Sequence, residues 1–123
     1  MALKLGNRDA AITQLKKGAL ELCILEVLAQ GVDRYGYELV KLVSQTISVT
    51  EGTIYPLLKR LKDNGLIESH LEDSTSGGPA RKYYKLTHAG MEEKKCQEND
   101  WLDFQKAMNH LIHSNQKGDN NEC

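Results

Sequence analysis

The sequence has few cysteines, and their placement excludes the usual roles of cysteine clusters. Cys23, Cys96 and Cys123 are widely separated, with no CxxC pair and no neighbouring histidine at ligand spacing. Neither a disulfide framework nor a zinc site has this spacing. We therefore expect Cys23, which lies in an apolar run, to behave as a small buried hydrophobe. Cys96 is expected to be a surface or interface thiol, with a redox-sensing role left open.

Long apolar runs are also absent. No stretch of the 123 residues approaches the length of a transmembrane helix, and residues 1–14 lack the apolar core of a signal peptide. The composition, 40% hydrophobic and 27% charged, is that of a soluble globular protein, and the length fits one domain with a small core. We expect a cytoplasmic protein.

Sequence patterns for catalysis are missing as well. The four histidines are scattered, and His110 with His113 at i, i+3 is more typical of a surface pair than of a metal site. Gly77-Gly78 is not followed by the GK[ST] of a phosphate-binding loop, and no local pattern identifies a nucleophile. We expect no enzyme, no catalytic residue, no cofactor and no bound metal.

The excess of charge of either sign is small. The formal net charge is -1, whereas a nucleic-acid-binding domain usually has a clear basic surface. The charges are unevenly distributed, however, because residues 50–90 contain six basic and five acidic side chains, and residues 91–123 contain four basic and seven acidic ones. A local basic cluster can still bind phosphate, with modest non-specific affinity. Its candidates are Lys59, Arg60, Arg81, Lys82 and Lys85.

Residues 50–65 have the clearest helical pattern in the chain. Apolar side chains recur at i, i+3, i+4 and i+7, which predicts one buried helix face. They are Ile54, Leu57, Leu58 and Leu61. The Thr50 hydroxyl can cap the first turn, and Asn64-Gly65 can end the helix. The opposite face has small and hydrogen-bonding residues first and cations later, the order needed to enter a DNA major groove and then meet phosphate.

The residues around this helix predict a winged helix-turn-helix, a mainly α fold with a small β-wing. Strand-like runs at residues 66–72 and 81–86 flank a polar, glycine-containing turn. Residues 35–46, before the central helix, predict a shorter helix that completes the helix-turn-helix. Its expected apolar residues are Tyr37, Leu39, Val40 and Val43. Pro56 alone conflicts with this prediction, because it removes a backbone hydrogen bond inside the central helix.

Two further helices predict a homodimer. Residues 16–30 are apolar around most of the helix circumference, which indicates burial on more than one side. In residues 88–113 the apolar positions repeat with a period of about 3.5 residues, which favours packing against another helix. These positions, which we call the seam, are Trp101, Phe104, Met108 and Leu111. Within one small chain only the outer side of the first helix could cover the seam, so dimerisation is the simplest solution.

We divide the chain into three parts. Residues 1–90 are expected to form the winged helix-turn-helix domain together with its N-terminal helix. Residues 91–113 are expected to form a C-terminal dimerisation helix in the same compact unit, and residues 114–123 a disordered tail. Whether residues 1–15 add a helical turn or an arm is left open.

Several motifs occur together in an order typical of one known family. They are Gly36-Tyr37-Glu38-Leu39, the GTIYPLLKRL run at 52–61, Gly65-Leu66-Ile67 and the GGPARKYYKLTHAG run at 77–90. This combined pattern resembles the PadR family of bacterial transcriptional regulators from about Lys16 to the end of the last helix. The short length and single C-terminal helix resemble the small PadR subfamily, which includes a multidrug-binding regulator.

The resemblance implies a repressor that binds a palindromic double-stranded DNA as a homodimer. The candidate DNA contacts are Thr53 and Tyr55 for base edges or nearby phosphate, Lys59 and Arg60 for phosphate, and Arg81 and Lys82 in the wing. Tyr55 could instead only pack between helix and wing. A winged-helix module that binds another protein, without a small-molecule effector, is the alternative function, and salt-sensitive DNA binding separates the two.

The resemblance also implies a site for a small planar aromatic or phenolic effector at the dimer interface. In the multidrug-binding regulator, the tryptophan that corresponds to Trp101 pairs across the dimer and sandwiches flat aromatic compounds. Leu22 and Glu26, one turn apart on the first helix, are candidates for the pocket wall, with Glu26 able to attract a cation. Gln105 stands where that regulator has an acidic residue, a departure that counts against copying its preference for cationic drugs. Filling of a hydrophobic interface is the simpler role for Trp101.

Overall fold

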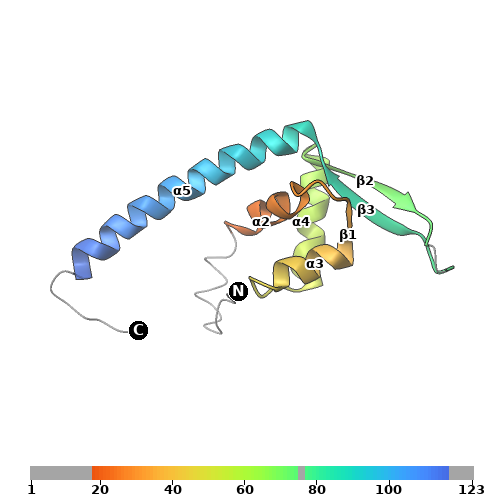
Figure 1. Cartoon of the computed structure of the whole chain (residues 1–123), viewed down its shortest axis with the longest axis horizontal. Coiled ribbons are helices and arrows are strands. Elements are labelled where there is room, and N and C mark those ends of the chain that lie inside the picture. Colours follow the sequence, from red (N-terminus) through yellow and green to blue (C-terminus); the bar gives the residue numbers. More distant parts are fainter. Residues whose placement is uncertain (1–17, 75–76, 117–123) are drawn as a thin grey trace.

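The computed structural model describes residues 18–74 and 77–116. Across these residues the chain forms helices α2 (Leu20–Leu28), α3 (Gly36–Ser44), α4 (Glu51–Asp63) and α5 (His88–Gln116). The strands are β1 (Arg34–Tyr35), β2 (Ile67–Glu72) and β3 (Arg81–Leu86). Figure 1 shows α2, α3 and α4 gathered into one body, with the β2–β3 hairpin projecting on one side and α5 extending far beyond the body on the other. This arrangement confirms the predicted winged helix-turn-helix with a C-terminal helix.

The core lies where the three short helices meet the base of the sheet. Its members are apolar side chains that are almost entirely removed from water: Leu20, Ile24, Leu25, Leu28, Leu39, Val40, Val43, Ile54, Leu58, Leu61, Ile67 and Tyr84. Three of the four residues predicted for the buried face of α4 belong to this group, and Leu57 is half-buried beside it. The helical period therefore predicted the orientation of α4 correctly. Tyr37 does not join the core as expected, because half of its side chain is exposed.

The two ends of α4 differ in how well the sequence predicted them. Gly65 has φ of +75°, and the amides of Gly65 and Leu66 donate to the carbonyls of Lys62 and Leu61. These two bonds form a Schellman ending, as Asn64-Gly65 predicted. At the other end, Thr50 is the N-cap residue but its hydroxyl makes no bond to a backbone amide. The hydroxyl lies 3.4 Å from that of Thr53 instead, so the predicted side-chain cap is wrong.

The sheet has the order β1-β3-β2, with antiparallel pairing throughout. The β2–β3 hairpin pairs Ile67 with Leu86 at its base and Glu72 with Arg81 at its end, which confirms the predicted wing. Strand β1 was not predicted, because the helix expected at residues 35–46 already included Tyr35. Its two residues pair with Tyr84 and Tyr83, and Tyr35 then precedes α3 with its amide donating to Glu38 Oε1 at 3.1 Å.

Helix α5 begins where the sequence predicted, at a cap made by Thr87. The Thr87 hydroxyl oxygen accepts the Gly90 amide at 3.0 Å and lies 2.7 Å from the carbonyl oxygen of Gly65. A side chain at Gly90 would collide with the Leu66 backbone, so the glycine allows α5 to start directly against the end of α4. The helix continues to Gln116, three residues beyond its expected end. Residues 117–123 of the expected tail lie outside the described residues.

Helix α2 is shorter than the predicted helix at residues 16–30, of which positions 16 and 17 lie outside the described residues, as do residues 1–15. It packs on the first half of α5, which leaves the second half of that helix without a neighbouring element among the described residues. In the described ranges, no helix combines the length and the apolar character that crossing a membrane requires.

Candidate DNA interface and the cavity beside α5

The exposed face of α4 displays the residues that the sequence assigned to DNA. Thr53 and Lys59 are exposed, and Tyr55 keeps 40% of its surface in solvent. Lys59 Nζ lies 3.0 Å from Asp63 Oδ2, and 79% of the lysine side chain is exposed. An exposed pair of this kind contributes little to stability, so the lysine can leave Asp63 for a phosphate at small cost.

Arg60 reaches from α4 to α2, and 58% of its side chain stays exposed. Its guanidinium lies 2.8 Å from Glu21 on α2, and the same glutamate accepts a hydrogen bond from Gln97 on α5 at 3.0 Å. Glu21 thereby joins three helices. A phosphate contact by Arg60 stays a prediction, and it would compete with this ion pair.

Tyr55 connects α4 to the start of α3. A Cβ atom added at Gly36 would lie only 2.6 Å from Tyr55 Cε1, so the ring lies almost against the glycine backbone. Burial, together with the negative charge of Glu51, raises the pKa of Tyr55 above its ordinary value, and the phenol stays protonated as a hydrogen-bond donor at neutral pH. The structure therefore gives Tyr55 both the packing contact and the exposed surface that were weighed as alternatives.

The wing brings its two basic residues near Tyr55. Arg81 stacks its guanidinium 4.7 Å from the centre of the Tyr35 ring, and Lys82 follows on the opposite face of β3. Both side chains are exposed. A cavity of about 170 Å³ lies between wing and helix, lined by Tyr35, Gly36, Tyr37, Tyr55, Arg81, Lys82 and Tyr84. Three of the six predicted DNA contacts therefore surround one depression.

Sequence reasoning missed two residues beside this surface. Tyr37, which we expected in the core, is half exposed, and Lys41 Nζ lies 5.7 Å from the centre of its ring. Tyr37 and Lys41 are four residues apart on α3, so both project from the same side of that helix. The signal available in the sequence was the spacing, because Lys41 follows Tyr37 by one helical turn near the start of the predicted helix.

A second, larger cavity lies between α2, the end of α3 and α5. It has a volume of about 650 Å³ and is lined by Ala19, Leu22, Cys23, Glu26, Val27, Leu42, Val43, Thr46, Ile47, Glu98, Trp101 and Leu102. Three of the four predicted ligand residues, Leu22, Glu26 and Trp101, meet here. Gln105, one turn further along α5, is not among the lining residues. Glu98 was missed, although its position three residues before Trp101 places it on the same side of the helix.

The polar wall of this cavity consists of two carboxylates that share one ammonium group. Lys94 Nζ lies 2.8 Å from Glu98 and 3.6 Å from Glu26. Burial and a hydrogen bond with Glu98 raise the pKa of Glu26, whereas hydrogen bonds with Glu26 and Lys94 lower the pKa of Glu98. Burial also raises the pKa of the Cys23 thiol, which keeps it protonated and unreactive near neutral pH.

The seam on α5 is exposed along its whole length in the single chain. The exposed fractions are 48% for Trp101, 57% for Phe104, 39% for Met108 and 58% for Leu111. Trp101 and Phe104 lie with ring centres 6.4 Å apart, and the adjacent Leu102 and Ile112 are exposed as well. A monomeric protein rarely leaves so continuous an apolar strip in water.

Both the sequence and the fold are similar to those of one protein family. The model of the transcriptional regulator PadR-like family matches residues 24–95. A PadR-like transcriptional regulator from Bacillus cereus is 39% identical in sequence, with a TM-score of 0.70 over 80% of this chain and 96% of that one. A PadR family regulator from Clostridium difficile is 34% identical, with a TM-score of 0.70 over 76% and 98%. One from Eggerthella lenta is 31% identical, with a TM-score of 0.74 over 84% and 89%.

Proposed function

Because this chain belongs to the PadR-like family of transcriptional regulators, we propose that it is a homodimeric repressor of the cytoplasm that binds a palindromic DNA operator. A small planar aromatic or phenolic effector at the dimer interface modulates this binding. The observation that carries the proposal is the division of the molecule into two surfaces. One is a basic and tyrosine-rich face on α4 and the wing, and the other is an apolar cavity and seam on α2 and α5.

The seam supports the dimer. A second copy related by a two-fold axis would cover the exposed apolar side chains of both α5 helices, and each buried leucine or phenylalanine side chain contributes roughly 1.5–3 kcal/mol. Because the contact is symmetric, each of these contributions to the free energy occurs twice. With both copies of α4 on one side of such a dimer, these helices would enter successive major grooves about 34 Å apart.

The cavity supports the effector. Trp101 is among its lining residues, and most of the lining is apolar, as is usual for small-molecule sites. The seam continues directly from the cavity, because Trp101 belongs to both. A ligand held there would change the angle or distance between the two subunits, and therefore the spacing of their recognition helices.

The alternative, a winged helix that binds another protein, draws support from the charges. The net charge is -1, and both Lys59 and Arg60 are engaged in ion pairs within the chain. Selection of genomic DNA fragments by the purified full-length protein distinguishes the two functions. We expect enrichment of palindromic fragments bound by two subunits, with affinity that falls steeply as salt rises.

One variant and two contradicting outcomes complete this experiment. Replacement of the exposed Thr53 by alanine should lower the preference for the selected palindrome over random DNA while leaving the fold intact. A protein that enriches no fragment and shows no salt-dependent DNA binding would be the protein-binding module instead. A monomer in sedimentation at micromolar concentration would contradict the dimer separately from the DNA result.

A further inference from the structure

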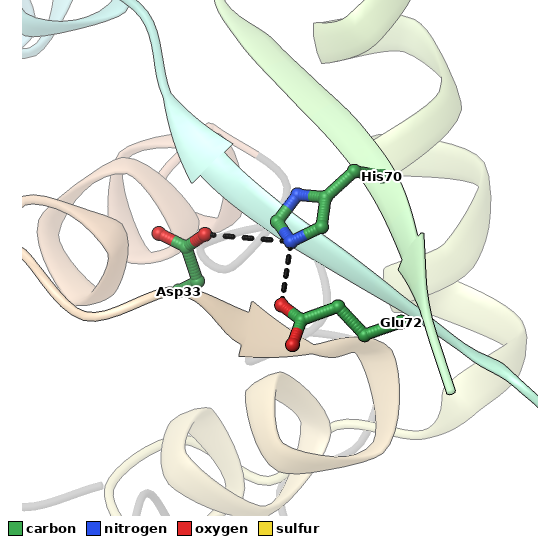
Figure 2. Close-up of side chains that lie close together, drawn as sticks. All are labelled: Asp33, His70 and Glu72. Carbon is green, nitrogen blue, oxygen red and sulfur yellow. Dashed lines mark hydrogen bonds and ion pairs between the residues drawn. The ribbon is translucent and has the colours of Figure 1, made fainter. Parts of the chain in front are cut away.

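Three side chains whose donor atoms converge lie where the wing meets the segment before β1. Figure 2 shows Asp33, in the segment that leads into β1, pointing toward His70 and Glu72 on β2. His70 Nε2 lies 2.7 Å from Glu72 Oε2 and 3.7 Å from Asp33 Oδ2. All three donor atoms lie within 4.8 Å of one another. None of these residues belongs to the proposed DNA contacts or to the cavity beside α5.

We propose that Asp33, His70 and Glu72 form a site for a divalent transition-metal ion, with Zn²⁺ as the natural candidate. One imidazole nitrogen and two carboxylate oxygens are a donor set that Zn²⁺ accepts. In a tetrahedral zinc site with bonds of about 2.1 Å, neighbouring donor atoms lie about 3.4 Å apart. The observed separations of 2.7 and 3.7 Å fall on either side of this value. Small rotations of exposed side chains therefore suffice to bind an ion.

The sheet holds the ligands in position. His70 and Glu72 are two residues apart on β2, so both project from the same face. The His70 ring stacks on Tyr83 of β3, with ring centres 5.9 Å apart and planes 18° apart, and Tyr83 in turn meets the edge of Tyr35 at 5.7 Å. This stack restricts the direction in which Nε2 can point. Aromatic support of this kind does for the histidine what a neighbouring hydrogen bond does in many metal sites.

The charges and the solvent exposure of these three side chains favour binding of a cation. Two carboxylates this close repel each other, and a divalent ion bound between them neutralises both charges. The side chains remain 39%, 40% and 55% exposed for Asp33, His70 and Glu72. An ion bound there keeps one side open for a water ligand and can be loaded from solution. It would join the hairpin end of β2 to the segment that precedes β1.

Metal binding by the full-length, metal-free protein tests this site directly. We expect calorimetric titration with Zn²⁺ to show one ion per subunit, and Zn²⁺ to raise the melting temperature of the wild type because it binds only the folded state. His70→Ala should weaken the affinity at least about tenfold, the minimum loss seen even when only a supporting group is removed. Asp33→Asn and Glu72→Gln preserve shape and should weaken binding in the same direction.

Two further measurements decide between this site and other zinc-binding groups. His110→Ala removes an exposed histidine of α5 outside the cluster and should leave affinity unchanged. Co²⁺ in place of Zn²⁺ should give a visible spectrum without thiolate charge-transfer bands. Equal binding by wild type and His70→Ala would overturn the proposal, and so would thiolate bands, which would assign the metal to cysteine. Absence of any Zn²⁺ binding would also overturn it and leave His70 and Glu72 as a hydrogen-bonded pair.

Discussion

Two helical glycines, Gly52 and Gly90, differ in how much space surrounds them. A side chain at Gly90 would meet the Leu66 backbone, where α5 starts against the end of α4. At Gly52, the nearest atom to an added Cβ would be Thr50 Oγ1 at 3.7 Å, an ordinary contact. Gly90→Ala should therefore destabilise the fold by about 1–3 kcal/mol through overpacking. Gly52→Ala should stabilise it by roughly 0.5–1 kcal/mol through helix propensity.

Denaturant unfolding at a fixed protein concentration measures both changes. Gly52→Ala is the matched control, because it makes the same chemical change in another helix. Loss of less than about 0.5 kcal/mol at Gly90 would show that α5 shifts freely away from Leu66, since surface substitutions stay within that range.

Lys59 provides a prediction about DNA. In Lys59→Ala, DNA affinity should fall similarly for all sequences, and the slope of log affinity against log salt should decrease by about one, because one phosphate contact is lost. Lys95→Ala is the control, since Lys95 is also an exposed helical lysine with an acidic neighbour, Glu92 at 3.8 Å. Its slope should match the wild type. If Lys59→Ala also leaves the slope unchanged, the contact belongs to another residue.

At the residue scale, sequence predicted local interactions better than distant ones. The cap by Thr87 and the ending at Gly65 follow from neighbouring residues, and both are present. The pairing of Arg60 with Glu21 joins positions 39 apart in the chain, so it arises only after α2 and α4 have packed. The missing cap at Thr50 is a local exception, because its hydroxyl pairs with that of Thr53, three residues on, instead of with a backbone amide.

The wing is the element whose contribution to DNA binding can be isolated most cleanly. Arg81 and Lys82 are exposed and lie outside the core, so the double change Arg81→Ala, Lys82→Ala should lower DNA affinity with little change in melting temperature. Lys85→Ala, on the same strand but paired with Glu68 at 3.5 Å, is the control and should have a smaller effect. Titration of labelled operator DNA measures all three proteins. Wild-type affinity in the double variant would mean that the wing does not contact DNA.

Most elements were predictable, and the exceptions have a common cause. The period of Ile54, Leu58 and Leu61 identified α4 and its buried face, and turn residues identified the β2–β3 hairpin. Strand β1 has only two residues and exists because Tyr83 and Tyr84 offer it a partner edge. The cavity residue Glu98 and the Asp33–His70–Glu72 cluster likewise depend on how elements pack, which a single sequence does not encode locally.

At the scale of the whole molecule, the outer half of α5 packs against no other element among the residues that the structure describes. Leu111 is 58% exposed, so Leu111→Asp should leave the single-chain fold intact while placing a charge in each half of the seam. Loss of two leucine contacts, roughly 3–6 kcal/mol in all, raises the dimer dissociation constant by about 10²- to 10⁴-fold. Sedimentation equilibrium measures this constant. The control is Lys106→Glu, which changes charge on the same helix, and equal dimerisation of both variants would place the interface elsewhere.

The last prediction joins the dimer to the effector through the only tryptophan. Planar aromatic compounds should quench Trp101 fluorescence and change DNA affinity together. Burial and the Glu98 hydrogen bond raise the pKa of Glu26, so this carboxylate loses its charge at a higher pH than an ordinary glutamate does. A cationic planar probe should therefore bind well at neutral pH and more weakly as pH falls through that raised pKa.

A neutral probe of the same shape should show no such dependence, and Glu26→Gln should remove it for the cation. Lys94 lies between Glu26 and Glu98 and offsets one of their two negative charges. The cationic probe is therefore attracted by a net charge of about one. Titrations at several pH values with both probes, followed by tryptophan quenching, measure these effects. If neither probe quenches Trp101 nor alters DNA binding, and Trp101→Ala only weakens the dimer, the residue fills the interface and the cavity beside α5 holds no effector.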